Sequence, residues 1–170
     1  MSNVNVKRAV ENIRSGTNVY TPLVETIVNA IQAIEAASIA KGRVDILVKR
    51  SNQEDLEGGQ PPIESFTVID NGIGFNDENR DSFDTLYSDH KIAQGGKGFG
   101  RFTCLKYFDD LLIESVFEHE GGRTKRTFKM GKQTDIIVNE IIEDNPDGDI
   151  GSRVTMRKVK RAFPDKKVKT

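Results

Sequence analysis

The segment from Pro22 to Ala40 constrains the fold most, because its apolar residues recur at intervals of three and four. They are Leu23, Val24, Ile27, Val28, Ala30, Ile31 and Ile34. This spacing is typical of a helix with one apolar face. Thr21 suits an N-cap, and Pro22 suits the first helical position. The segment therefore predicts a long amphipathic helix.

Strand-like segments dominate the rest of the chain. Apolar and alternating patterns predict strands over Val44–Val48, Phe66–Ile69, Leu111–Phe117, Arg123–Met130, Asp135–Ile142 and Arg153–Val159. Shorter helices are expected over Val6–Ile13, Asn79–Leu86 and Phe99–Phe108. Because helices come early and strands late, we expect an α+β fold. It would be a two-layer α/β sandwich, with a mixed, mostly antiparallel sheet covered by helices on one face.

Size and charge limit the function classes without naming a partner. The 170 residues suit one domain, expected over residues 1–160, with 161–170 as a basic tail or a linker to a further domain. The 25 basic and 26 acidic residues nearly cancel, so no long-range field favours nucleic acid or an anionic membrane. Cys104 is the only cysteine, which fits a reducing cytoplasm. No apolar run approaches the length of a membrane span.

Glu25 and Asn29 lie four residues apart on the predicted helix and therefore project from one face. Mg²⁺ prefers oxygen ligands and keeps waters and phosphate oxygens, so the amide oxygen of Asn29 suits a nucleotide-bound ion. Glu25 suits the orientation and deprotonation of an attacking water. The alternative is that the pair is simply the solvated face of the helix. Against it, Val28, Ala30 and Ile31 crowd Asn29, and a polar group near a buried edge needs a partner.

The run Asp70-Asn71-Gly72-Ile73-Gly74 follows directly on an apolar strand. A carboxylate here suits the exocyclic amine of adenine as a hydrogen-bond acceptor. The glycines allow the backbone to approach a flat ring. In isolation the same residues favour an ordinary turn between strands.

Four glycines in six positions form the run Gly95-Gly96-Lys97-Gly98-Phe99-Gly100, which precedes Arg101 and a predicted helix. Free backbone amides, a helix N-terminus and two cations make a phosphate-binding environment. The segment also suits a lid that closes over bound nucleotide; the alternative is a flexible loop that binds nothing. A P-loop is excluded, because Gly96-Lys97 is followed by Gly98 rather than by serine or threonine.

These motifs occur in one order, and a fourth, Gly151-Ser152-Arg153-Val154-Thr155, opens the last predicted strand. From about Leu23 to Val159 the set resembles the Bergerat nucleotide-binding fold of the GHKL superfamily. That superfamily contains gyrase-type, heat-shock-chaperone, histidine-kinase and MutL-type proteins.

The resemblance implies a role for each motif. Glu25 would be the general base, Asn29 the Mg²⁺ ligand and Asp70 the acceptor for the adenine amine. Gly72 and Gly74 would lie beside adenine, with the Ser152 hydroxyl next to the aspartate. The phosphates would contact the lid, which comprises Gly95, Gly96, Lys97, Gly98, Phe99 and Gly100. Family members typically have aspartate or another polar residue where Gln32 stands, and we assign Gln32 no role.

The resemblance also implies an ATPase that binds ATP and Mg²⁺, turns over slowly alone and acts as a conformational switch. The Gly-Phe-Gly-Arg-Phe lid is closer to the chaperone, MutL and MORC-like branches than to sensor kinases. We therefore expect the N-terminal part of a larger protein, with an ATP-dependent homodimer formed through flanking domains. Nucleic acid is not indicated for this domain, although the full-length protein leaves that partner open. A protein histidine or serine kinase and a non-catalytic nucleotide sensor remain alternatives.

Overall fold

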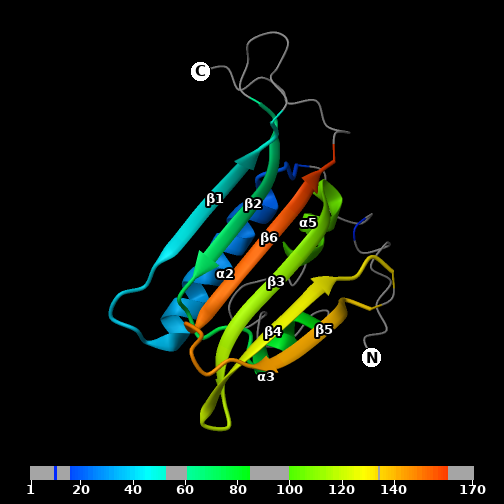
Figure 1. Cartoon of the computed structure of the whole chain (residues 1–170). Coiled ribbons are helices and arrows are strands. Elements are labelled where there is room, and N and C mark those ends of the chain that lie inside the picture. Colours follow the sequence, from blue (N-terminus) through cyan, green and yellow to red (C-terminus); the bar gives the residue numbers. More distant parts are fainter. Residues whose placement is uncertain (1–9, 11–15, 53–60, 85–99, 134, 161–170) are drawn as a thin grey trace.

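The computed structural model describes residues 10, 16–52, 61–84, 100–133 and 135–160 (Figure 1). Its helices are α2 (Thr21–Ala37), α3 (Asp77–Asp84) and α5 (Gly100–Tyr107). Its strands are β1 (Val44–Arg50), β2 (Ile63–Asp70), β3 (Phe108–His119), β4 (Gly122–Met130), β5 (Ile137–Asp144) and β6 (Gly151–Val159). Within this part of the chain, no helix is both long enough and apolar enough to cross a membrane.

The strands form a six-stranded sheet in the order β1-β2-β6-β3-β4-β5. Every neighbouring pair runs antiparallel. Figure 1 shows α2, α3 and α5 behind the sheet, on one face. The expected α+β fold with one covered face is therefore confirmed, and the sheet described is antiparallel throughout rather than mixed.

The core lies between the helices and the covered face of the sheet. It takes alternate residues from the strands, such as Phe66 and Val68 from β2 and Leu111 and Ile113 from β3. Phe128 packs edge-to-face on two other aromatic rings, with centroids 5.4 and 5.6 Å away. Burial of a side chain of this size contributes roughly 1.5–3 kcal/mol. The core therefore fixes which strand residues face the helices.

Most predicted elements are present, with bounds shifted by a few residues. The helix expected over Pro22–Ala40 runs over Thr21–Ala37 and ends at Ser38, which has a φ of 51°. Thr21 is not the N-cap, because Tyr20 holds that position without a side-chain cap. Thr21 Oγ1 instead accepts a hydrogen bond from the Asn18 amide at 2.9 Å. The helix predicted over residues 6–13 lies outside the described residues except for Val10, which is helical.

Candidate functional site

A cavity of about 400 Å³ lies between α2, α3, the loop after β2 and the covered face of the sheet. Its lining brings together five residues singled out from the sequence: Glu25, Asn29, Asp70, Gly74 and Ser152. Gly72 is not in the lining, although its amide contacts Asp70. Gly95, Gly96, Lys97, Gly98 and Phe99 lie outside the described residues, and Gly100 is the first residue of α5. The structure thus assembles three of the four motifs.

Asp70 is the buried carboxylate of this cavity. It ends β2 opposite Ser152 in the β2–β6 register, and its Oδ1 accepts a hydrogen bond from the Gly72 amide at 2.9 Å. Burial raises the pKa of Asp70 from its ordinary value of 3.8 to about 6, although backbone hydrogen bonds from Gly72 and Ser152 act in the opposite direction. Because burying the charged form of Asp70 is unfavourable, a ligand in the cavity that donates a hydrogen bond to this carboxylate would stabilise it.

Two glycines allow the loop after Asp70 to pack tightly. Gly74 has a φ of 76°, and a Cβ placed there would lie 2.5 Å from the Val116 carbonyl oxygen. A Cβ on Gly72 would lie 2.5 Å from the backbone carbonyl carbon of Ala33 in α2. The Ile73 amide donates a hydrogen bond to the Ala33 carbonyl at 3.1 Å. The loop is thereby held between α2 and β3.

A pair of buried hydroxyls completes this wall of the cavity. Ser115 Oγ donates to the Gly151 carbonyl at 2.8 Å and accepts from the Phe75 amide at 2.8 Å. It lies 3.2 Å from Ser152 Oγ. Because a hydroxyl has a single proton, Ser152 is the donor between the two serines. The lone pairs of Ser152 Oγ therefore remain available as acceptors beside Asp70.

Glu25 and Asn29 lie on the cavity side of α2. Both side chains are exposed, and Pro22, Thr26 and Gln32 line the cavity from the same helix. Leu23, Ile27 and Ala30 occupy the side of the helix that packs into the core. The two polar residues thus line the cavity while remaining accessible to solvent.

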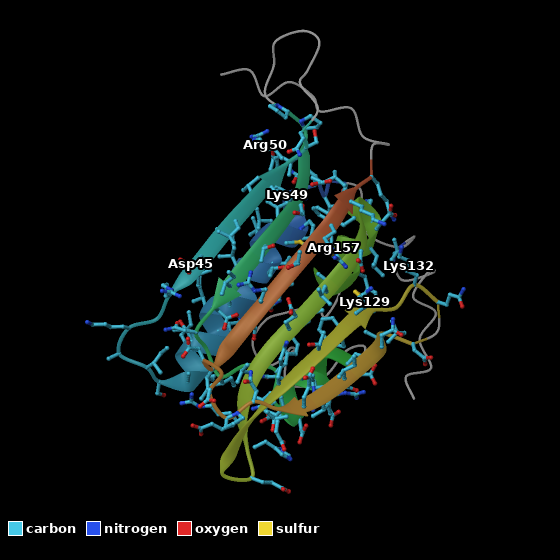
Figure 2. All side chains as sticks on the ribbon, viewed as in Figure 1. Asp45, Lys49, Arg50, Lys129, Lys132 and Arg157 are labelled. Atoms are coloured by element: carbon cyan, nitrogen blue, oxygen red, sulfur yellow. The ribbon has the colours of Figure 1, made fainter. Side chains whose placement is uncertain are left out.

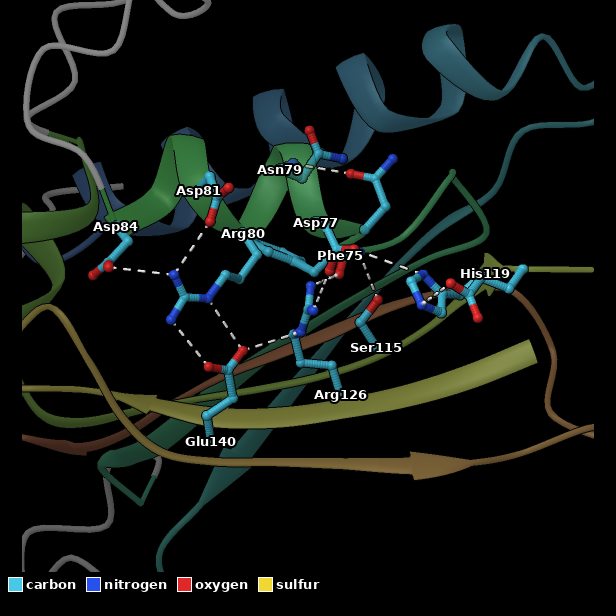
Figure 3. A network of polar contacts seen from close by, with 12 residues as sticks. Phe75, Asp77, Asn79, Arg80, Asp81, Asp84, Ser115, His119, Arg126 and Glu140 are labelled. Atoms are coloured by element: carbon cyan, nitrogen blue, oxygen red, sulfur yellow. Dashed lines mark hydrogen bonds and ion pairs between the residues drawn. The ribbon is translucent and has the colours of Figure 1, made fainter. Parts of the chain in front are cut away.

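Sequence reasoning missed a polar network beside the cavity, centred on Arg126 of β4 (Figure 3). The Arg126 side chain is only 4% exposed and its guanidinium lies 4.8 Å from the Phe117 ring centroid. It donates to the Phe75 carbonyl at 2.7 Å and to Asp77 Oδ1 at 2.5 Å, and it holds the pKa of Asp77 below its usual range. Asp77 begins α3, so Arg126 ties the loop and the helix to the sheet.

Glu140 of β5 extends this network to the body of α3. It accepts two hydrogen bonds from the Arg80 guanidinium, at 3.2 and 3.0 Å, and lies 3.1 Å from Arg126 Nε (Figure 3). Asn79, which lies between Asp77 and Arg80 in α3, donates a hydrogen bond to the Gly74 carbonyl at 2.9 Å and lines the cavity. The network therefore positions the α3 wall. Strand alternation places Arg126 on the covered face, and that is the only signal the sequence offers for its role.

A second hollow, of about 600 Å³, is lined largely by charged residues such as Asp110, Lys129 and Lys132. Figure 2 shows Lys129 and Lys132 near the β4–β5 connection. The hollow contains none of the residues predicted for the site. We therefore take the cavity beside α2 as the candidate site.

Solved structures share this fold. The N-terminal domain of a DNA repair protein aligns at 16% identity and a TM-score of 0.55, over 91% of this chain and 39% of that one. The ATPase region of Saccharomyces cerevisiae topoisomerase II aligns at 19% identity and a TM-score of 0.54, over 81% of this chain and 37% of that one. The ATPase and transducer domains of Balamuthia mandrillaris topoisomerase II align at 15% identity and a TM-score of 0.56, over 82% of this chain and 37% of that one. This chain thus spans under two fifths of these proteins.

Sequence comparison identifies the family. No curated protein sequence matches the chain. The family model for histidine kinase-, DNA gyrase B- and HSP90-like ATPases matches residues 17–160, which is most of the chain and includes every motif of the candidate site. The chain belongs to the histidine kinase-, DNA gyrase B- and HSP90-like ATPase family.

Proposed function

We propose that the chain binds ATP, with the adenine amine donating to Asp70. The observation that carries this proposal is a buried carboxylate, held by the Gly72 amide, in the lining of a cavity whose α2 side carries Glu25 and Asn29. A volume of about 400 Å³ suits a small molecule. Ser152 adds a second acceptor for the amine or for a bridging water, and Gly74 lets the backbone approach the ring.

The phosphates and Mg²⁺ would lie toward Asn29 and Glu25. Among the described residues, no group of three or more His, Cys, Asp or Glu side chains could hold a metal ion. An ion beside Asn29 would thus take its other ligands from phosphate and water, which is the usual habit of Mg²⁺. When bound, Mg²⁺ neutralises charge on the phosphates. Glu25 would orient the attacking water and take its proton.

The lid residues Gly95 to Gly100, with Lys97, would contact the phosphates and exclude water. Hydrolysis would then rest mainly on positioning and charge stabilisation. We further propose that the domain spans residues 1–160, that 161–170 link it to another domain, and that the whole protein is a cytoplasmic conformational switch. In that setting ATP would close a homodimer through flanking domains, and the domain alone would hydrolyse ATP slowly.

Binding is tested by thermal unfolding with and without Mg·ATP. A ligand that binds only the folded state stabilises it by about 2.7 kcal/mol at one hundred times its Kd, so the unfolding temperature should rise. Asp70→Asn should lose most of this rise, whereas Asp144→Asn, at an exposed position of β5 outside the cavity lining, should keep it. No rise at concentrations far above typical affinities would overturn the proposed binding.

Hydrolysis is tested by phosphate release in the full-length protein. Glu25→Ala should abolish release while the thermal response to Mg·ATP persists. The matched control is Glu35→Ala, because Glu35 is an exposed carboxylate on the same helix outside the cavity lining. Transfer of labelled phosphate to a protein would support the kinase alternative. Binding without any release would support the non-catalytic sensor.

A further inference from the structure

Strand β1 forms one edge of the sheet (Figure 1). It carries three consecutive apolar residues that are about half-exposed. Ile46, Leu47 and Val48 expose 45%, 52% and 49% of their surface. Among the described residues β1 pairs only with β2, so its other edge presents backbone groups with no strand beside them. Natural edge strands are usually protected by charge, bulges or a covering element. In β1 the charged residues and a register shift between Lys49 and Arg50 lie toward its ends, and its centre is apolar.

Helix α2 extends this apolar surface. Val24, Val28 and Ile31 expose 57%, 45% and 45% of their surface. Their spacing of four and three places them in one stripe along the helix. None of them belongs to the cavity lining, so the stripe lies on a different side of α2 from the candidate site.

The register of β1 shows which of its apolar residues lie on the same face of the sheet as α2. Ile46 and Val48 lie opposite Val68 and Phe66 of β2, which are core residues beneath the helices. Directly paired residues of an antiparallel sheet share a face. Ile46 and Val48 therefore point to the side of the sheet on which α2 lies, while Leu47 points to the other side.

The sequence of β1 is self-complementary. When two copies of β1 run antiparallel with Leu47 facing Leu47, Asp45 of each copy lies opposite Lys49 of the other, and Ile46 lies opposite Val48. Figure 2 shows Asp45 and Lys49 toward the two ends of the strand. Opposite charges directly across two strands stabilise their pairing. Within one copy, Asp45 forms an exposed ion pair with Arg43 at 3.1 Å, and Lys49 forms one with Glu64 at 2.7 Å.

We propose that β1 is the interface of a symmetric homodimer that forms without nucleotide. The two sheets join edge to edge, and the two α2 helices flank an apolar trough with Ile46 and Val48 of both copies at its floor. The same patch on each copy meets itself, as a two-fold axis requires. The self-complementary charges single out a second copy of this chain, rather than an unrelated strand, as the occupant. The inference is independent of the proposed ATP chemistry.

Sedimentation equilibrium of the chain without nucleotide should show a monomer–dimer equilibrium in the micromolar range. Leu47→Cys should then form a disulfide-linked dimer under mild oxidation, because Leu47 lies on the two-fold axis and the native Cys104 is buried. Ile141→Cys is the matched control, since Ile141 is 56% exposed on β5, the opposite edge strand. A wild-type chain that stays monomeric, or equal cross-linking at both edges, would overturn the proposal.

A charge exchange tests the register itself. Lys49→Asp puts an acidic residue at both position 45 and position 49, and Asp45→Lys puts a basic residue at both, so each variant alone should lose at least tenfold in dimer affinity. An equimolar mixture of the two should regain the dimer, because each acidic strand then faces a basic one. Thermal unfolding checks that both variants are folded. Two folded variants that dimerise as well alone as when mixed would contradict this register.

Discussion

The two ends of the candidate site are built differently. At the end proposed for adenine, Asp70, Gly74 and Ser152 are held by strand register, a backbone contact to α2 and buried hydroxyls. At the end proposed for the phosphates, the described residues contribute Glu25 and Asn29 from one helix face. The first end is therefore shaped by the fold before any ligand arrives. The second depends far more on what the nucleotide, Mg²⁺ and the lid would add.

The largest expected effect concerns Arg126, which supports the adenine end from outside the cavity. Arg126→Leu should lower the free energy of unfolding by about 3 kcal/mol, because it removes the hydrogen bonds that a buried guanidinium donates to Asp77 and to the Phe75 carbonyl. Denaturant unfolding measures this loss. Arg153→Leu, at an exposed position of β6, should cost less than about 0.5 kcal/mol. Equal losses in the two variants would show that the network does not stabilise the fold.

The contrast between the two ends also appears in what the sequence could predict. The three-and-four spacing in α2 and the alternation in the strands are local signals, so the elements and the positions of Glu25 and Asn29 could be predicted. Asp70 could be placed at a strand end, but its pairing with Ser152 depends on register between segments far apart in sequence. Strand alternation could place Arg126 on the covered face but not its partners, because these come from the loop after β2, from α3 and from β5.

The next effect is the pH dependence of stability at the adenine end. Because the pKa of Asp70 rises from 3.8 to about 6 on folding, the folded state binds the proton more tightly. The contribution of the Asp70 carboxyl to the free energy of unfolding is fully present below about pH 4. It is lost as the pH rises through 6, a change of up to about 3 kcal/mol. Asp70→Asn should remove this dependence.

Urea unfolding between pH 4 and 8, without nucleotide, measures this pH dependence of the free energy of unfolding. Relative to the wild type, Asp70→Asn should gain stability as the pH rises, even though it loses the response to Mg·ATP. A constant difference between the two proteins over this range would show that Asp70 titrates normally. Glu25→Gln, at the other end of the cavity, is the control for a carboxylate removed from the site.

A smaller effect separates backbone strain from close packing in the loop after Asp70. Gly74→Ala forces a Cβ against the Val116 carbonyl at a positive φ, and should cost about 2 kcal/mol. Gly121→Ala has the same kind of φ, 81°, with nothing within 4 Å of the new Cβ, so it should cost only about 1 kcal/mol. Thermal unfolding of both variants provides the comparison. Equal costs would mean that the loop yields and that the adenine end is less tightly packed than the structure indicates.

The smallest effect tests the hydroxyl of Ser152. Ser152→Ala removes an acceptor beside Asp70 while the strand register remains, so the affinity for Mg·ATP should fall by about two- to tenfold, the value of one neutral hydrogen bond. Phosphate release at saturating ATP should be unchanged, since Glu25 and Asn29 lie at the other end of the cavity. Asn29→Ala should instead change the Mg²⁺ concentration that is required. If Ser152→Ala shifts the Mg²⁺ requirement as well, the two ends are coupled, and the division between a preformed adenine end and a ligand-completed phosphate end does not hold.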